Sequence, residues 1–235
     1  MFPFDRPTNY NEMLNKIGAF TFLEALLLTL LVGWASPQAG ALLGSYALPI
    51  KVFSIEIPLL YVVPAVIIAL IARIVRLHDK VSDVFGLRSM FDLYRVLVPL
   101  AGAIGVAVDE SLRTALSQLR KKAMQRTFYQ FASFEDPKIS KALVLSAIDV
   151  WTWYWILGEL LVLLATAGVL LLFLHAFQVA AYVILCTWLL TILFCSFYNV
   201  CGAKADHQIN EIVSDQSRVE ILRSEFQRIV EQAKP

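Results

Sequence analysis

Long apolar stretches alternate with shorter polar ones along this chain. Four stretches carry few charged side chains, and they cover residues 17–35, 53–72, 148–174 and 176–198. A helix needs about 20 apolar residues to cross a hydrocarbon layer about 30 Å thick. The pattern therefore predicts an all-α integral membrane protein with four transmembrane helices and a cytoplasmic helical portion.

The composition of the chain points the same way. Of its 235 residues, 58% are hydrophobic and 17% are charged, and the mean hydropathy is +0.66. Soluble domains are about 45–50% apolar and about 25% charged. An ordinary water-soluble domain is therefore not expected.

The basic residues indicate how the four helices are oriented. If all four stretches cross, 19 of the 20 Lys and Arg residues fall on one side, and 12 of them lie between Arg73 and Lys141. Cytoplasmic loops carry an excess of Lys and Arg. We therefore expect both termini and the long central loop in the cytoplasm, with a bacterial inner membrane as the location.

The predicted organisation has five parts. They are a cytoplasmic N-terminus at 1–16, two transmembrane helices at 17–72, a cytoplasmic helical region at 73–146, two more transmembrane helices at 147–199, and a cytoplasmic amphipathic helix at 200–235. The apolar piece at 96–108 is too short to cross unaided. It is expected to be buried in the cytoplasmic region, or to be a re-entrant or interfacial piece.

Apolar residues recur at near-heptad spacing in the C-terminal segment, which is typical of an amphipathic helix. Such a helix is stable only when its apolar stripe is buried. The stripe could pack on 73–146, on a sister subunit or on another protein, so a homo-oligomer and a cytoplasmic protein partner are expected. The candidate interface residues are Ile209, Ile212, Val219, Leu222, Phe226 and Val230.

The pair His78-Asp79 has the residue types of a metal phosphohydrolase site. A divalent metal needs further ligands from other segments, however, and the chain has only three His residues, none of them before His78. On a helix, Asp79 and Asp83 instead lie on one face, with Arg76 and Lys80 nearby. Residues 73–95 are therefore predicted to form a packed, salt-bridged linker.

Motifs of membrane enzymes are missing from the sequence. It contains no HExxH, no GxGD, no Gly-rich phosphate loop and no dinucleotide fingerprint. We therefore expect no enzyme activity, no cofactor or metal, and no direct binding of nucleic acid.

Carboxylates within the apolar stretches are the main candidates for function. At 1.5 Å per residue, Glu24 lies about 12 Å past Lys16 and Glu159 lies about 15 Å past Asp149, so both are placed near mid-membrane. Glu56 is placed near the outer end of the second stretch. A carboxylate at that depth costs at least about 2.5–3.5 kcal/mol and tends to face a bundle interior or water.

Three interpretations of these carboxylates stay open. A protonated Glu could hydrogen-bond to a neighbouring hydroxyl and hold helices together. A ring of Glu24 or Glu159 could line a cation pathway in an oligomer, or one subunit could carry out coupled transport. The hydroxyl candidates are Thr21, Thr166, Thr187 and Tyr61.

A basic run, RKKAMQR, spans residues 120–126. Each basic residue near an anionic lipid surface gains about 1 kcal/mol. Either this run contacts lipid headgroups or it is an ordinary solvated face. The lipid-contact candidates are Arg120, Lys121, Lys122 and Arg126.

The stretch HDKVSDVFGLRSMFD at 78–92, together with the chain length and the number of predicted spans, resembles the small membrane subunit of the Kiwa anti-phage defence system. That resemblance implies an oligomeric membrane subunit that holds a cytoplasmic partner at the membrane. It assigns no functional residue.

These observations favour a non-enzymatic, oligomeric membrane sensor or scaffold that couples a membrane event to a cytoplasmic partner, with bacterial anti-phage defence as the setting that the resemblance implies. Membrane lipids are the other expected partner. The alternative is a pore- or channel-forming effector in which Glu24 and Glu159 line a cation pathway.

Overall fold

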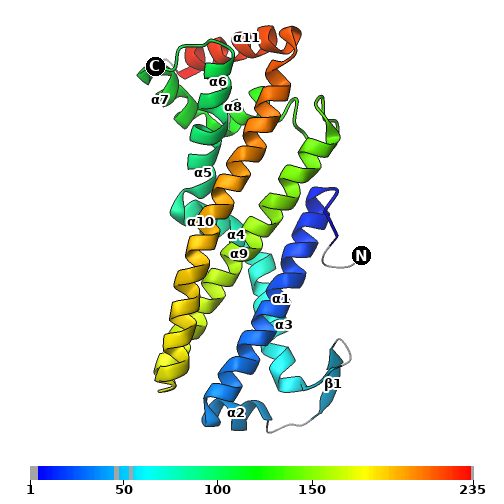
Figure 1. Ribbon diagram of the computed structural model, residues 1–235, viewed down its shortest axis with the longest axis vertical. Helices are drawn as coiled ribbons and strands as arrows, with labels where there is room; N and C mark the ends of the chain where they lie inside the picture. Colours follow the sequence, from blue (N-terminus) through cyan, green and yellow to red (C-terminus); the bar gives the residue numbers. More distant parts are fainter. Residues whose placement is uncertain (1–4, 45–47, 53–54, 234–235) are drawn as a thin grey trace. The chain divides into compact units, whose positions relative to one another are not determined.

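The computed structural model describes residues 5–44, 48–52 and 55–233, and most of these residues are helical (Figure 1). They form two compact units. The first is made of Met1–Asp5, Leu14–Val81 and Thr152–Ser196, and the second of Arg6–Met13, Ser82–Trp151 and Phe197–Pro235. The expected helical fold is confirmed, with one short β-hairpin added.

The long helices carry most of the first unit. They are α1 (Tyr10–Ala35), α3 (Leu59–Val75), α9 (Lys141–Phe173) and α10 (Phe177–Val213), and the shorter α2 (Pro37–Gly44) follows α1. Among the described residues, α1, α9 and α10 are long and apolar enough to cross a membrane. They coincide with three of the four predicted apolar stretches.

The second apolar stretch does not form the continuous helix that was predicted for 53–72. Residues 53 and 54 lie outside the described part, and β1 (Pro49–Val52) pairs antiparallel with β2 (Ile55–Pro58). The helix α3 begins only at Leu59, because Pro58 has no backbone N–H and holds the residue before it in an extended conformation. Pro58 therefore ends a strand, and only Pro64 lies inside the helix.

α3 ends at Arg76, whose left-handed backbone (φ 52°) separates it from α4 (Leu77–Phe85). The axes of α3 and α4 differ by 57°, and the pair makes a fourth apolar span only if the two helices are counted as one. The second of the four predicted spans is thus part of a bent element, and its bend at Arg76 lies within the charged stretch at 73–95.

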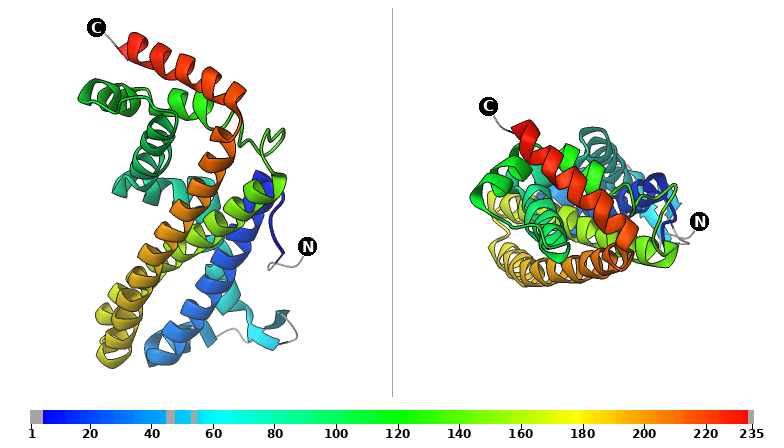
Figure 2. Two further views of the ribbon diagram at one scale, coloured as in Figure 1. Left: turned by 45° about the horizontal axis from the view of Figure 1, so that its top comes forward. Right: turned by 90° about the horizontal axis from the view of Figure 1, so that it is seen from above.

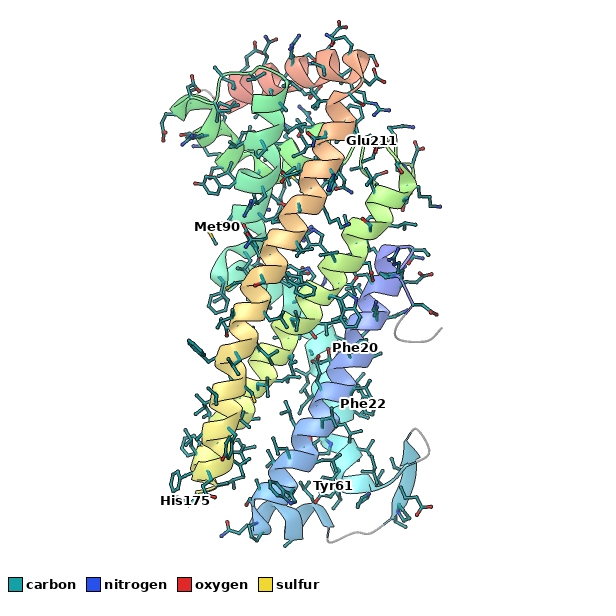
Figure 3. All side chains as sticks on the ribbon, in the orientation of Figure 1. Phe20, Phe22, Tyr61, Met90, His175 and Glu211 are labelled. Carbon is teal, nitrogen blue, oxygen red and sulfur yellow. The ribbon has the colours of Figure 1, made fainter. Side chains whose placement is uncertain are left out.

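Small residues let α1 approach α3 closely. A Cβ added at Gly33 would lie 2.4 Å from Cε1 of Tyr61, so a larger residue there requires the Tyr61 ring to shift. Phe22 and Tyr61, both labelled in Figure 3, pack against a buried cluster. The members of that cluster are Ala25, Leu26, Ile57, Val62 and Ala65.

α9 and α10 form the tight antiparallel hairpin that the sequence predicts. The turn places His175 in the left-handed region (φ 57°), and the Ala176 N–H donates to the Leu171 carbonyl at 2.9 Å (Figure 1). Leu171 and Ala180 are fully buried beside this turn.

Short helices make up most of the second unit. They are α5 (Leu87–Phe91), the π-helical turn η1 (Asp92–Leu97), α6 (Val98–Ala103), α7 (Glu110–Gln118), α8 (Arg120–Thr127) and α11 (Gln216–Ala233). Val96, Leu97, Leu100 and Ala101 are buried there. The segment 96–108 is thus buried at its start, whereas Gly102, Ala103, Gly105 and Ala107 are exposed.

The C-terminal segment differs from the prediction in two respects. First, α10 continues without a break to Val213, so the amphipathic helix is only α11. Asp215 separates the two helices, because its carboxylate accepts hydrogen bonds from the backbone N–H and the hydroxyl of Ser217 at 2.9 and 2.6 Å. A side chain that caps a helix in this way favours a new helix start.

Second, Ile209 and Ile212 of the predicted stripe belong to α10, and the other members belong to α11. α11 packs on α7 and α8 (Figure 2). Its stripe is buried there, so of the three alternatives predicted for the stripe the structure shows packing on 73–146. The buried candidates are Ile209, Ile212, Val219, Leu222 and Phe226, and Val230 is half-buried.

Candidate functional site

Glu159 on α9 is the centre of a buried polar cluster in the first unit. Its side chain is 2% exposed, and both carboxyl oxygens have partners. Oε2 lies 2.5 Å from the Thr21 hydroxyl of α1. Oε1 accepts the backbone N–H of His78 at 3.2 Å and lies 3.3 Å from His78 Nδ1. Three segments far apart in the sequence therefore meet at one carboxyl group.

Thr21 contributes a hydroxyl with two close neighbours. Threonine in a helix commonly donates to the carbonyl four residues earlier, and here the Thr21 hydroxyl lies 2.9 Å from the Ile17 carbonyl. The same oxygen lies beside Glu159. Of the four hydroxyl candidates, Thr21 is the one found beside a carboxylate, whereas the hydroxyls of Thr166 and Thr187 donate to carbonyls of their own helices.

His78 reaches the cluster because of the break between α3 and α4. It is the second residue of α4, and N–H groups in the first turn of a helix have no partner within that helix. Glu159 supplies the partner, and a carboxylate is favoured there by the helix dipole. The expected pair between Arg76 and Asp79 is present at 3.0 Å, so the stretch is salt-bridged as predicted. The stretch also contributes His78 to the cluster, in addition to the packed and salt-bridged structure that was predicted.

A cavity of about 40 Å³ adjoins the cluster. A space of this size and polarity can hold a water molecule, which needs at least about 10–15 Å³ and two or more polar partners. Arg73 lines it as well, and its guanidinium donates to the Asn15 side chain at 3.0 Å. The lining residues are Leu14, Ile17, Gly18, Thr21, Ala72, Arg73, Arg76, His78 and Glu159.

Glu24 is a second buried carboxyl group of the first unit. It lies on α1 one turn after Thr21, is 9% exposed, and its Oε2 has no hydrogen-bond partner among the described residues. The charges of Glu24 and Glu159 interact. Glu56, by contrast, is exposed on strand β2 before α3 begins, so its predicted place within a membrane helix is wrong.

Trp155 lies beside the imidazole of His78. The two ring centroids are 6.1 Å apart and the rings are tilted by 52°. Trp155 is four residues before Glu159 on α9, so the same helix face carries both. This indole is placed to report on the charge of His78.

The basic run on α8 is divided between two roles. Arg120 forms an ion pair with the buried Asp92, and an Arg126 nitrogen lies 3.9 Å from a Glu225 oxygen on α11. Lys121 and Lys122 are exposed. Arg120 and Arg126 thus contact acidic side chains of the second unit, and the side chain of Arg126 is also 38% exposed. Lipid contact stays a prediction for this run.

No group of three or more His, Cys, Asp or Glu side chains that could hold a metal ion occurs among the residues that the structure describes. No sequence pattern connects His78 to Glu159, because the two residues lie 81 positions apart. Its neighbourhood also fits an ordinary amphipathic helix.

The family of the chain is shown by comparison with known proteins. A model of the YmfE protein family matches residues 9–228, and the chain belongs to this family. Neither a curated protein nor a solved structure matches the chain. The match carries no link to anti-phage systems, so that setting stays a prediction.

Proposed function

We propose that this member of the YmfE protein family is a non-enzymatic membrane protein that senses a change at the membrane and reports it to a cytoplasmic partner. The buried cluster of Glu159, Thr21 and His78 carries this proposal. A carboxyl group on an apolar helix is costly, and such groups are usually retained for function.

The membrane setting is supported by α1, α9 and α10, with the bent pair α3–α4 as the proposed fourth span. Four spans place both termini and the second unit in the cytoplasm, because basic residues are concentrated in those segments. Cysteines introduced singly at Glu135 and at His175 test this topology. A membrane-impermeant thiol reagent applied from outside should label only the second, and labelling of the first would overturn it.

Chain connectivity supports a reporting role. α4 begins in the first unit, where Glu159 accepts the N–H of His78, and ends in the second unit. A change of charge at Glu159 would therefore act on a helix that both units share. We propose the second unit as the part that binds the partner and sister subunits.

Anti-phage defence is the setting that we propose for this role, on the resemblance of the stretch at 78–92 and of the overall architecture. Phage challenge of cells with and without the gene tests the setting separately. Equal plaque counts across a phage panel would remove the setting and leave the sensor role standing.

A cation pathway is less well supported. Glu24 and Glu159 are both buried by the first unit of their own chain, and two arginines line the adjoining cavity. A pore-lining carboxylate would face water. Cation flux can be measured into vesicles that contain the purified chain. Flux in the wild type that is reduced in both Glu24→Gln and Glu159→Gln would favour the pore instead.

Purification from native membranes tests the proposed function. The full-length chain, Glu159→Gln and the exposed control Glu56→Gln are isolated in mild detergent, and native mass and bound proteins are measured. We expect a mass above that of one chain, and a cytoplasmic protein whose bound amount changes in Glu159→Gln but not in Glu56→Gln. Equal amounts in all three samples would refute a sensing role for this site.

A further inference from the structure

The hydroxyl of Thr21 has one hydrogen and two neighbours that could accept it. Its oxygen lies 2.9 Å from the Ile17 carbonyl and 2.5 Å from Glu159 Oε2. A hydroxyl donates once and can accept twice. A proton on Glu159 Oε2 would let both short contacts be full hydrogen bonds at the same time.

Two arrangements follow from this count of hydrogens. With a proton on Oε2, Glu159 donates to the Thr21 oxygen and Thr21 donates to the Ile17 carbonyl. When that proton leaves, the Thr21 hydroxyl turns to donate to the ionised Glu159, and the Ile17 carbonyl keeps only its bond within the helix. Each arrangement leaves Oε1 free to accept from His78, so both can exist in the same backbone.

His78 contacts the carboxyl group of Glu159 through both its backbone and its ring. The backbone N–H of His78 donates to Oε1 at the start of α4, where the helix dipole favours a negative charge. His78 Nδ1 lies beside the same oxygen, and Nε2 lies 3.8 Å from Asp79 Oδ1. A protonated imidazole would thus lie between two carboxylates.

Other charged groups of the first unit also bear on this carboxyl group. Arg73 and Arg76 line the cavity, and Arg76 is paired with Asp79. Glu24 is a second buried carboxyl group of the first unit, one turn after Thr21 on α1. The cavity of about 40 Å³ offers a place for the water that would take or return the proton.

We propose that Glu159, Thr21 and His78 form a binding site for one exchangeable proton, whose release or uptake sets the charge at the junction of α3 and α4. This inference rests on the proposed function, because it identifies the signal that the protein senses as a change in proton availability. Loss of the charge removes the anionic partner from the first turn of α4. The bend at Arg76 is then held less firmly.

Infrared difference spectroscopy tests the site directly. The full-length protein in detergent is recorded while the pH is stepped, and the carbonyl stretch of protonated carboxyl groups is followed. We expect one transition that is absent in Glu159→Gln and retained in Glu56→Gln. An unchanged set of transitions in Glu159→Gln would overturn the proposal.

Thr21→Val supplies a second, conservative variant. It removes a hydroxyl that donates to the ionised carboxylate, and hydrogen bonds to charged groups are worth about 1 kcal/mol more than neutral ones. The midpoint of the Glu159 transition should therefore move to higher pH by about one unit. A midpoint that stays in place would refute the role of Thr21.

Tryptophan fluorescence reports on His78 independently. The tryptophan fluorescence of the wild type is recorded as the pH is changed. If Trp155→Phe and His78→Asn each abolish the change in fluorescence, a titrating group lies beside that indole. The same change persisting in His78→Asn would exclude His78 from the site.

The outcomes separate this inference from the proposed function. If the Glu159 transition is present but partner binding is equal in all variants, the proton site stands and the sensor role fails. If partner binding changes in Glu159→Gln while no transition depends on that residue, the sensor role stands and the proton site fails.

Discussion

Glu159 Oε1 lies 3.2 Å from the backbone nitrogen of His78 and 3.3 Å from its Nδ1, although 81 positions separate the two residues. A side chain of α9 thus fixes the first turn of α4. Arg76 precedes this first turn and has a left-handed backbone conformation. The chain bends there, away from the direction of α3. The carboxyl group of Glu159 therefore connects the packing of α9 on α4 to the bend between α3 and α4.

The Thr21 hydroxyl should contribute more to stability than other hydroxyls on the apolar helices. Thr21→Val keeps the shape of the side chain but leaves Glu159 Oε2 buried without its partner, so we expect a loss of about 1–3 kcal/mol. Thr166→Val is the matched control, because that hydroxyl is exposed and donates only within its own helix.

Urea unfolding of both variants in detergent, followed by circular dichroism, measures the difference. A loss in Thr166→Val as large as that in Thr21→Val would show that the contact with Glu159 adds nothing.

Because α1 packs closely on α3, replacement of Gly33 by a larger residue should destabilise the protein. An added methyl group would lie 2.4 Å from the ring of Tyr61, and overpacking of this kind costs about 1–3 kcal/mol. Gly44→Ala is the control, since a Cβ there meets nothing within 4 Å. Thermal unfolding should show a lower midpoint for Gly33→Ala alone.

A double variant separates the clash from a change of helix propensity. Tyr61→Ala removes the atoms that the new methyl group would meet, so Gly33→Ala should cost less in that background. Equal costs in both backgrounds would contradict the packing of Tyr61 on Gly33.

Local patterns in the sequence were sufficient for the long helices. The apolar runs located α1, α9 and α10, and the break at His175 located the hairpin, because both depend on neighbouring residues. The second apolar stretch was predicted to be one helix, but Pro58 within it ends a strand. A proline at the end of an apolar run fits a strand end equally well, and only the pairing of β1 with β2 decides between them.

Only part of the candidate site could be predicted from the sequence. The cost of burying a carboxyl group singled out Glu24 and Glu159, and Thr21 was among the named hydroxyls. His78 was assigned to a linker, because Arg76 and Asp79 beside it explain the local charge pattern without it. No spacing rule connects residue 78 to residue 159, so the contact appears only when α4 and α9 are packed together.

Two aspartates of the second unit should show opposite dependence of stability on pH. Burial raises the pKa of the Asp92 carboxyl above its ordinary value of 3.8, although Arg120 and Arg88 oppose the shift. The stabilisation from Asp92 is therefore complete below that value and is lost as the pH rises through the raised pKa. The hydroxyl of Ser217 lowers the pKa of Asp215, so its contribution is present above 3.8 and is lost as the pH falls.

Denaturant unfolding of the wild type, Asp92→Asn and Asp215→Asn between about pH 2 and pH 7 measures both slopes. The difference in unfolding free energy between wild type and Asp92→Asn should fall as the pH rises. The corresponding difference for Asp215→Asn should fall as the pH drops. Slopes of the same sign would contradict the burial of Asp92 beside Arg120.

Phe226 decides between internal packing and an interface for the C-terminal stripe. It is 1% exposed in the second unit, where α11 packs on α7 and α8. Truncation of a fully buried phenylalanine costs about 3–5 kcal/mol. Phe226→Ala should therefore lower the unfolding free energy by that amount, whereas Ile221→Ala, at a site that is 46% exposed, should change it little.

Native mass in detergent is the second measurement on the same samples, since it distinguishes the two roles of the stripe. If Phe226 packs only within its own chain, the folded fraction of Phe226→Ala keeps the wild-type mass. If the stripe joined subunits, the variant would instead dissociate while each subunit kept its thermal stability. Limited proteolysis supports the distinction, because a weakened contact of α11 with α7 exposes cleavage sites after Arg223 and Arg228 before the long helices are cut.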